Sequence, residues 1–208
     1  TINGTTAVCL NATAPQLTFS GANGNAAFTF TYTVNGGAIL TITTTAGNSV
    51  TLAVPTSSAG TFTYSLLTVT DANGATCTQN ATGTEVVTVN PLPTATISGT
   101  TSVCLNALEP QITFTGAGAT APYTFYYTIN GGAVQNITTT TGNSVTVNVP
   151  TTTAGTFTYS LQSVTDASST ICSQQQTGSA AVTVWPLPTA SYTTNSPVCQ
   201  EGIISFTD

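Results

Sequence analysis

The most chemically distinctive residues of this chain are its five cysteines, which lie at regular spacings. Cys9, Cys104 and Cys199 follow one another at intervals of 95 residues, and Cys77 recurs 95 residues later as Cys172. The sequence contains neither a CxxC motif nor a Cys/His pattern of the kind that binds zinc. The cysteines therefore predict disulfide chemistry and no metal site.

Two equivalent cysteine pairs follow from the spacing. We expect Cys9 to pair with Cys77 and Cys104 with Cys172, so that each bridge closes a loop of 68 residues. A loop of that length stabilises a domain by roughly 4 kcal/mol on the chain-entropy model. The alternative is two reduced, buried thiols per repeat. Cys199 is expected to have its partner beyond this sequence, and disulfides indicate a location outside the cytoplasm.

The cysteine spacing belongs to a long internal repeat. Roughly two-thirds of residues 1–95 match residues 96–190 without insertion or deletion. The unit of structure is therefore expected to be one repeat of 95 residues and not the whole chain. Asp71 recurs as Asp166, the only acidic residue that is repeated. A chain built of near-copies is more typical of a spacer or an array than of an enzyme.

Composition excludes several classes of function. The chain has no Lys, Arg, His or Met and only six acidic residues, for a formal net charge of −6. Without bases it cannot neutralise the phosphates of a nucleic acid, nor be attracted to an anionic membrane surface. No stretch approaches the ~20 apolar residues that span a bilayer. We therefore expect neither a nucleic-acid partner nor membrane insertion by this segment.

Catalysis is not expected either. General acid–base chemistry near neutral pH usually needs His or a paired carboxylate, and the acidic residues here are scattered. Lysine nucleophiles, Ser-His-Asp triads and Cys-His pairs cannot be assembled from these residue types. The sequence predicts a protein that is not an enzyme, without catalytic residues and without a cofactor.

Hydrophobic periodicity predicts an all-β fold. Residues 28–34 alternate strictly between aromatic or apolar residues and threonine, as in a strand with one face on a core. Asn35-Gly36-Gly37 supplies the positive φ angles of a tight hairpin, and residues 61–70 form a longer strand. About seven short strands in some ninety residues, without a helical period, are typical of an antiparallel β-sandwich.

Proline-rich joints divide the chain. We expect an immunoglobulin-like repeat over 1–90 with a truncated N-terminal edge, a second over 91–185, and the start of a further domain over 186–208. Two prolines in three residues favour an extended, semi-rigid connection, which would join the sandwiches into a rod. Trp185 replaces Asn90 at the second joint and is expected to pack between units, the alternative being an exposed ligand-stacking side chain. The predicted linker residues are Pro91, Pro93, Trp185, Pro186 and Pro188.

The repeated aspartates have two interpretations. Asp71 and Asp166 are carboxylates, which calcium prefers as ligands, and calcium rigidifies some extracellular arrays. No second carboxylate lies near either of them in the sequence. Turn initiation by Asp is the favoured interpretation.

Several segments resemble the tandem immunoglobulin-like and PKD-like repeats of very large surface proteins of the Bacteroidota, including gliding-motility adhesins. The resemblance rests on residues 59–66, on residues 69–74 with Cys77, on the joint at residues 87–93, and on Val198-Cys199 with Phe206-Thr207-Asp208. In an immunoglobulin-like domain, Tyr64 and Tyr159 would stand at a tyrosine corner, the alternative being ordinary core aromatics. The resemblance implies export, through the type IX secretion route, to the bacterial cell surface.

The expected function is a structural stalk that projects an adhesive tip and bears force, with neighbouring repeats of the same polypeptide as partners. One alternative is a module that binds surface glycans or surface proteins through the aromatic run Tyr123–Tyr127. Another is a self-assembling filament subunit that adds strands edge to edge, since the threonine-rich edges lack Lys.

Overall fold

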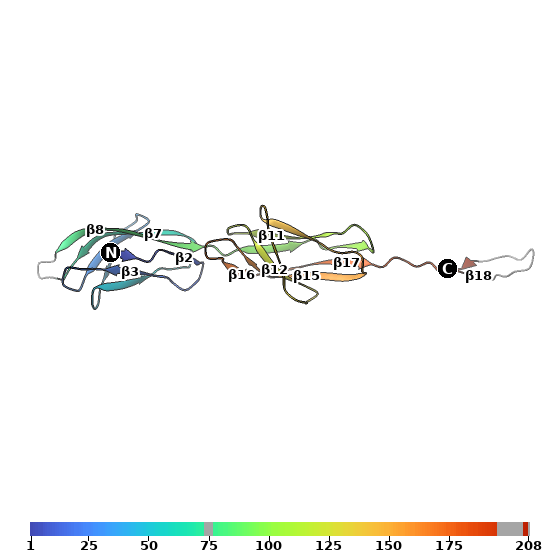
Figure 1. Ribbon diagram of the computed structural model, residues 1–208, viewed down its shortest axis with the longest axis horizontal. Coiled ribbons are helices and arrows are strands. Elements are labelled where there is room, and N and C mark those ends of the chain that lie inside the picture. The colour runs from blue at the N-terminus through green and yellow to red at the C-terminus, as the bar shows by residue number, and fades with distance from the viewer. Residues whose placement is uncertain (73–76, 195–205, 208) are drawn as a thin grey trace, which may run out of the picture.

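The computed structural model describes residues 1–72, 77–194 and 206–207, and the described part of the chain contains no helix. Two β-sandwiches lie end to end (Figure 1). The fold class predicted from the periodicity is therefore confirmed. The Asn73-Gly74 turn and Cys199 lie outside the described residues.

The first sandwich contains eight strands among the described residues. A three-stranded sheet has the order β1-β3-β6 and a five-stranded sheet the order β2-β8-β7-β4-β5. The strands are β1 (Ile2–Asn3), β2 (Thr6–Cys9), β3 (Gln16–Ser20), β4 (Thr29–Val34), β5 (Leu40–Thr43), β6 (Ser49–Ala53), β7 (Gly60–Thr70) and β8 (Thr78–Asn90).

The second sandwich repeats this arrangement. Its sheets have the orders β9-β11-β14 and β10-β17-β15-β12-β13, with β16 paired to β15. The strands are β9 (Thr94–Ser98), β10 (Thr101–Cys104), β11 (Gln111–Ala117), β12 (Thr124–Ile129), β13 (Gln135–Thr138), β14 (Ser144–Asn148), β15 (Gly155–Thr165), β16 (Ser173–Gln175) and β17 (Ser179–Trp185). Beyond it, β18 (Thr193–Thr194) pairs with β19 (Phe206–Thr207).

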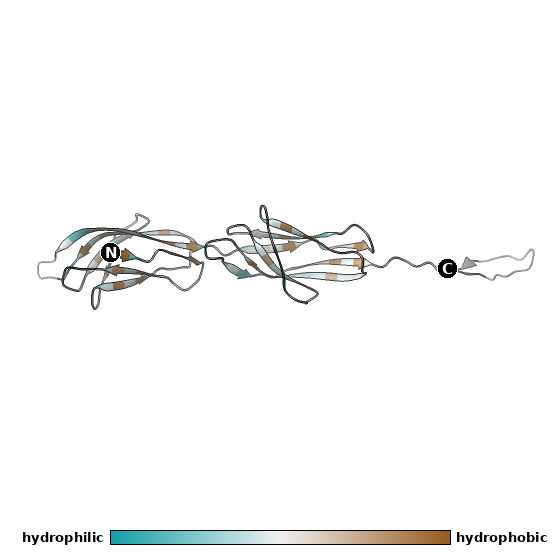
Figure 2. Cartoon of the chain, viewed as in Figure 1, coloured by the Kyte–Doolittle hydropathy of each residue, from teal (hydrophilic) through white to brown (hydrophobic). Residues whose placement is uncertain are grey.

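Alternation along the strands builds a separate core in each sandwich. In β4, Phe30 and Tyr32 are buried, whereas the three threonines that alternate with them are only partly buried. The apolar residues appear as isolated brown bands along the strands in Figure 2. The first core gathers buried residues from Ile2 to Val87 and the second those from Ala95 to Val184. Each core therefore belongs to one sandwich, and contact between the sandwiches must come from their ends.

The tight hairpins form where glycine and asparagine predict them. Asn35 has φ 51° and Gly36 φ 68°, the left-handed angles that a two-residue turn requires. The Asn35 Oδ1 accepts a hydrogen bond of 2.7 Å from the backbone N–H of Thr63 on the neighbouring strand. Asn35 thus adopts the backbone angle of the turn and also connects the turn to β7 through its side chain.

Tyr64 and Tyr159 pack as core aromatics. The Tyr64 ring lies 6.3 Å from Tyr32 and the Tyr159 ring 5.9 Å from Tyr127, measured between ring centroids. Burial raises the pKa of Tyr64 above its usual value of 10.0, and a negative charge on Tyr32 would raise it further. Tyr159 has its pKa raised by burial and then by Tyr127.

These pKa shifts predict alkaline destabilisation. A tyrosine with a raised pKa stays protonated in the fold while the unfolded chain ionises, so stability is complete below about pH 10 and falls above it. We expect the Tm, measured by calorimetry on thiol-alkylated protein, to decrease from pH 10 to pH 11.5. In the double variant Tyr64→Phe, Tyr159→Phe, the Tm should decrease less over this pH range than in the unaltered protein. In the control Tyr192→Phe, at an exposed position, it should decrease as much as in the unaltered protein. Equal slopes in all three proteins would contradict the assignment.

Candidate functional site at the joint between the sandwiches

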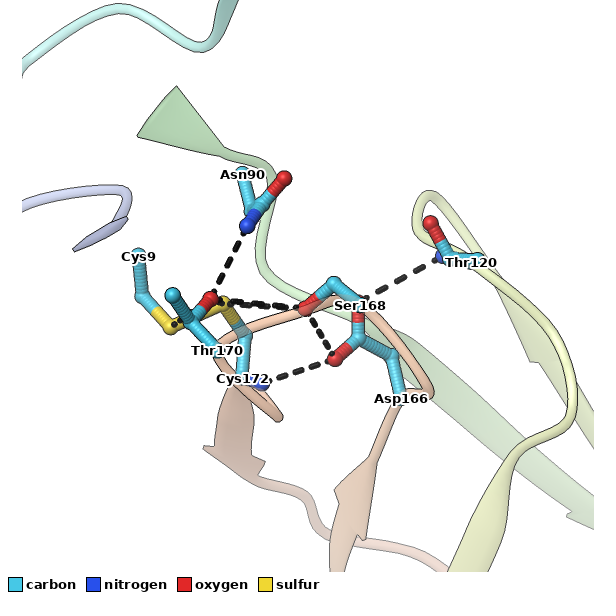
Figure 3. The surroundings of a disulfide bond; sticks show 7 residues. All are labelled: Cys9, Asn90, Thr120, Asp166, Ser168, Thr170 and Cys172. Atoms are coloured by element: carbon cyan, nitrogen blue, oxygen red, sulfur yellow. Dashed lines mark hydrogen bonds between the residues drawn. A yellow bond between two sulfur atoms is a disulfide. The ribbon is translucent and has the colours of Figure 1, made fainter. Parts of the chain in front are cut away.

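A disulfide joins the two sandwiches. Cys9 of the first is bonded to Cys172 of the second, with Cα atoms 5.6 Å apart and a sequence separation of 163 residues (Figure 3). A closed loop of that length is worth about 5 kcal/mol against unfolding of both sandwiches on the chain-entropy model. The bridge adds a second covalent connection beside the peptide linker.

The prediction that Cys9 pairs with Cys77, and Cys104 with Cys172, is therefore wrong. Cys9 lies beside Asn90 at the end of β8, whereas Cys77 immediately precedes the start of β8. A strand of 13 residues extends about 40 Å, and Cα atoms more than about 7 Å apart cannot be bridged. The two cysteines of one repeat stand at opposite ends of its sandwich.

Parallel strand pairing places Cys9 at the joint. β2 runs parallel to the last residues of β8, with Cys9 opposite Asn90. The backbone N–H of Leu10 then donates to the Asn90 carbonyl at 2.8 Å, and that of Asn11 donates to the Thr56 carbonyl at 2.9 Å. The Cys9 side chain is therefore held beside Asn90, the last residue of β8 before the linker.

The loop at residues 166–172, between β15 and β16, presents Cys172. Asp166 is buried, and its Oδ1 accepts hydrogen bonds from the Cys172 backbone N–H at 2.7 Å and from the Ser168 hydroxyl at 2.8 Å. Its Oδ2 receives a longer bond of 3.5 Å from the Thr120 backbone N–H. Ile171 adopts φ 50° so that the loop can turn back. Asp166 thus organises the loop, in agreement with its predicted role in initiating a turn.

Thr170 lies between the two sulfur atoms and the first sandwich. Its Oγ1 is 3.4 Å from the Cys9 Sγ and 3.2 Å from the Cys172 Sγ. Asn90 donates from Nδ2 to the same oxygen at 2.9 Å (Figure 3). This hydrogen bond between the sandwiches accompanies the covalent bond. Sequence reasoning placed Asn90 at the first joint without assigning it a contact, and it did not single out Thr170.

Further contacts lie beside the first linker. Thr94 donates from Oγ1 to the Ala117 carbonyl at 3.3 Å, and the Ala95 backbone N–H donates to Gln176 Oε1 at 3.1 Å. Pro91 is half-buried and Pro93 is buried. The chain that enters the second sandwich is therefore hydrogen-bonded to it from Thr94 onward.

The second predicted joint is open by comparison. Trp185 is 58% exposed, and both Pro186 and Pro188 are exposed. Packing of Trp185 between units, and the semi-rigid character of both linkers, remain predictions. Cys77 and Cys104 are exposed free thiols.

The described residues contain no group of three His, Cys, Asp or Glu side chains that could hold a metal ion. The part of the chain that the structure describes also has no helix long and apolar enough to cross a membrane. What the joint can do is mechanical: it fixes one sandwich to the next through a covalent bond, a hydrogen bond and a linker.

No family model matches the chain, and no curated protein matches it. Solved structures do. A Ca²⁺-stabilised adhesin that helps an Antarctic bacterium reach out and bind ice matches over 93% of this chain and 50% of that chain, at 21% identity and a TM-score of 0.50. A 1.5-MDa bacterial ice-binding adhesin matches over 88% of this chain and 64% of that chain, at 20% identity and a TM-score of 0.44.

An amphioxus IgVJ-C2 molecule also matches, over 86% of this chain and 99% of that chain, at 13% identity and a TM-score of 0.36. The chain spans about half of the first adhesin structure. At 21% identity the likeness to the first adhesin structure shows the fold alone, and it agrees with the all-β sandwiches described above.

The Asp166 carboxylate can be tested through the bridge that it supports. Replacing Asp166 by Ala leaves the buried Cys172 N–H and Ser168 hydroxyl without their acceptor, at a cost of about 1–3 kcal/mol. We expect the Cys9–Cys172 bond to be reduced at a lower thiol concentration in a glutathione redox buffer. Asp71→Ala, at the same position of the first repeat, is the matched control and should leave the midpoint unchanged. An unchanged midpoint in Asp166→Ala would show that the loop does not depend on the carboxylate.

The bridge also determines how far the chain can be stretched. Between the two termini, the shortest covalent path runs from Thr1 to Cys9, across the disulfide, and on from Cys172. Under tension applied at the termini, residues 10–171 cannot be extended while the bridge is intact. In single-molecule force spectroscopy we therefore expect no release of a whole sandwich, which would lengthen the chain by roughly 300 Å at about 3.5 Å per residue.

The matched variants for this experiment are Cys9→Ser and Cys104→Ser, which remove equivalent cysteines of the two repeats. Cys9→Ser should show two long unfolding events, and Cys104→Ser should behave as the unaltered chain. Long events in the unaltered, unreduced chain would contradict the bridge.

Proposed function

We propose that this chain is a stalk segment of a large secreted cell-surface adhesin, which projects an adhesive tip from the cell and bears force. The observation that carries the proposal is the Cys9–Cys172 disulfide between consecutive sandwiches. A bridge inside a domain stabilises that domain, whereas a bridge between domains fixes their relative position. Fixed position is what a stalk requires of its units.

The arrangement of the strands supports this role. The sandwiches lie end to end, and the strand that leads into the linker, β8, runs the length of the first one (Figure 1). Tension along the rod would enter the first sandwich through β2 and leave it at Cys9 across the disulfide, so the intact bridge would carry the load past β8.

The adhesin structure with a TM-score of 0.50 supports the same proposal by analogy. That adhesin is described as helping a bacterium to reach out, a task that would suit an extended array of sandwiches. We propose the same extracellular location at a bacterial cell surface, with export through the type IX route and a Bacteroidota gliding-motility adhesin as the parent protein. Boundaries at residues 90/91 and 185/186 divide the array into its units in this proposal, with neighbouring repeats as partners and without catalysis.

Binding of glycans or surface proteins by the aromatic run is less well supported. Tyr123, Phe125 and Tyr127 are all buried in the second core, which leaves only Tyr126 partly accessible. Stacking on a sugar needs an exposed ring face, so the run has little surface to offer.

Edge-to-edge assembly into a filament is the second candidate, and one observation favours it. β5 and β13 end their five- and six-stranded sheets, and Ile39 and Leu40 on the first edge and Val134 beside the second are exposed. Apolar edges without Lys are open to pairing with another strand. Filaments of this kind would grow sideways from the rod.

Electron cryotomography of intact cells, with an antibody fragment raised against one repeat, tests the proposal. We expect label at intervals along single surface fibres, because each repeat would be one unit of the stalk. An antibody fragment that binds the joint around the Cys9–Cys172 bridge should label the same fibres, and it should no longer bind them after the disulfides are reduced. Label confined to fibre tips would indicate a binding module, and label across bundled, laterally joined fibres would indicate edge-to-edge assembly.

A further inference from the structure

Equivalent cysteines of the two repeats differ in exposure. Cys172, which is bonded to Cys9 of the first sandwich, is 1% exposed, whereas Cys77, at the same position of the first repeat, is exposed. Cys9 is half-buried in the joint, whereas its equivalent Cys104 is exposed. Each repeat therefore carries two bridge positions at opposite ends, and the described residues fill one position of each repeat.

The open end at Cys104 has the same local structure as the filled end at Cys9. β10 runs parallel to β17 with Cys104 opposite Trp185, and the Leu105 backbone N–H donates to the Trp185 carbonyl at 2.8 Å. The Thr151 hydroxyl donates to the Ala107 carbonyl at 2.6 Å, as Thr56 does to Ala12. Cys104 is thus held in the geometry in which Cys9 forms its bridge.

Apolar side chains surround the open end. Trp185 is 58% exposed, Leu187 52% and Leu108 93%, all within a few residues of Cys104 or of its pairing partner in β17. At the filled end, Asn90 and Leu92 occupy the positions of Trp185 and Leu187 and are only partly exposed. The end of the second sandwich at Trp185 thus has a larger apolar surface than the end of the first sandwich at Asn90. The described residues cover it less than the second sandwich covers the end at Asn90.

The open end at Cys77 matches the filled end at Cys172. The Asp71 Oδ1 accepts a hydrogen bond of 3.2 Å from the Cys77 backbone N–H, and the Asp71 N–H donates to the Cys77 carbonyl at 3.1 Å. Asp166 holds Cys172 through the same two bonds. A hollow of about 330 Å³ adjoins Cys77 and is lined by Ala22 among others. The residue of the second repeat that is equivalent to Ala22 is Ala117, and its carbonyl accepts a hydrogen bond from the hydroxyl of Thr94, just after the linker.

We propose that Cys77 and Cys104 are the two halves of further bridges of the Cys9–Cys172 type, so that a ladder of disulfides runs along the whole array. Cys104 pairs with the Cys172-type residue of a repeat docked on the Trp185 end. Cys77 pairs with the Cys9-type residue of a repeat docked on the opposite end. This inference rests on the proposed function, because it requires further repeats in the same polypeptide.

Formation of each bridge is an oxidation. Two thiols lose two protons and two electrons and form one S–S bond, and a disulfide oxidant such as oxidised glutathione takes up both and becomes two thiols. The oxidising exterior that is proposed for this protein supplies oxidants of that class.

Overlap between successive bridges gives the ladder a mechanical property that a single bridge lacks. Each bridge spans 163 residues, but the repeat is only 95 residues long, so successive bridges overlap. A covalent path along the array can therefore use every second bridge. Such a path leaves one bridge at Cys172 and enters the next at Cys199, and it follows only 27 residues of backbone for every two repeats. Fully extended, 27 residues reach about 90–97 Å, against about 80 Å for two folded sandwiches of some 40 Å each. An array with this ladder is almost inextensible without reduction.

Disulfide mapping of the whole protein from its source tests the ladder. Thiols are trapped with N-ethylmaleimide, and the unreduced protein is digested with pepsin and chymotrypsin, since a chain without Lys or Arg gives trypsin no site. We expect Cys104 and Cys77 in peptides cross-linked to adjacent repeats. Maleimide on both residues beside an intact Cys9–Cys172 bond would overturn the ladder and leave the stalk proposal standing. Bonds from Cys9 to Cys77 and from Cys104 to Cys172 would overturn both.

A lengthened recombinant chain provides an independent test. A second copy of residues 96–190 inserted after Ala190 adds two cysteines and one repeat. If the copy of Cys172 pairs with Cys104, the number of thiols trapped by maleimide after oxidation by glutathione disulfide stays the same as in the original chain. Cys104→Ser in the lengthened chain is the control and should free the copy of Cys172. A rise of two trapped thiols, with Cys9–Cys172 intact, would exclude the ladder.

Discussion

The parallel pairing of β2 with the last residues of β8 is the constraint on which the joint depends. It places Cys9 at the end of the sandwich that meets the next repeat and so separates it from Cys77 by the length of β8. Had the N-terminal strand paired in the antiparallel direction, its last residue would face the other end of the sheet. The direction of one four-residue strand thus decides whether the cysteines stabilise a domain or connect two.

Hydroxyl groups replace ion pairs on the surfaces of these sandwiches. Facing threonines on neighbouring strands hydrogen-bond to each other, as between Thr29 and Thr43 at 3.0 Å and between Thr124 and Thr138 at 2.8 Å. Such cross-strand pairs suit a sheet with one wet face and stabilise it modestly. Because the threonine pairs carry no charge, the stability that they provide does not depend on salt concentration or on pH. The pH dependence described above comes from the buried tyrosines. That independence suits a protein exposed to a changing exterior.

Sequence reasoning predicted the fold well, since it depends on patterns within a few residues. The alternation at residues 28–34 and the Asn35-Gly36 turn report the backbone directly, and β4 and its hairpin formed there. The joint was predicted less well, because pairing between Cys9 and Cys172 depends on which repeat end meets which. The length of β8 separates Cys77 from Cys9 only because β2 pairs in parallel with the far end of β8, and no local pattern in the sequence predicts that pairing. The interaction of Asn90 with Thr170 left no pattern, since residue 90 is replaced by Trp185 in the second repeat.

The bridge between repeats also has a consequence for the order of events during biosynthesis. Cys172 lies 163 residues after Cys9, and Cys77 lies between them as a nearer thiol. In an unfolded chain the nearer thiol is the more frequent encounter, because the entropy of closing a loop grows with its length. Folding of the first sandwich removes that competitor by carrying Cys77 to the far end. The correct bond is thus selected by the order of events as well as by geometry: the first sandwich must fold before Cys9 is oxidised.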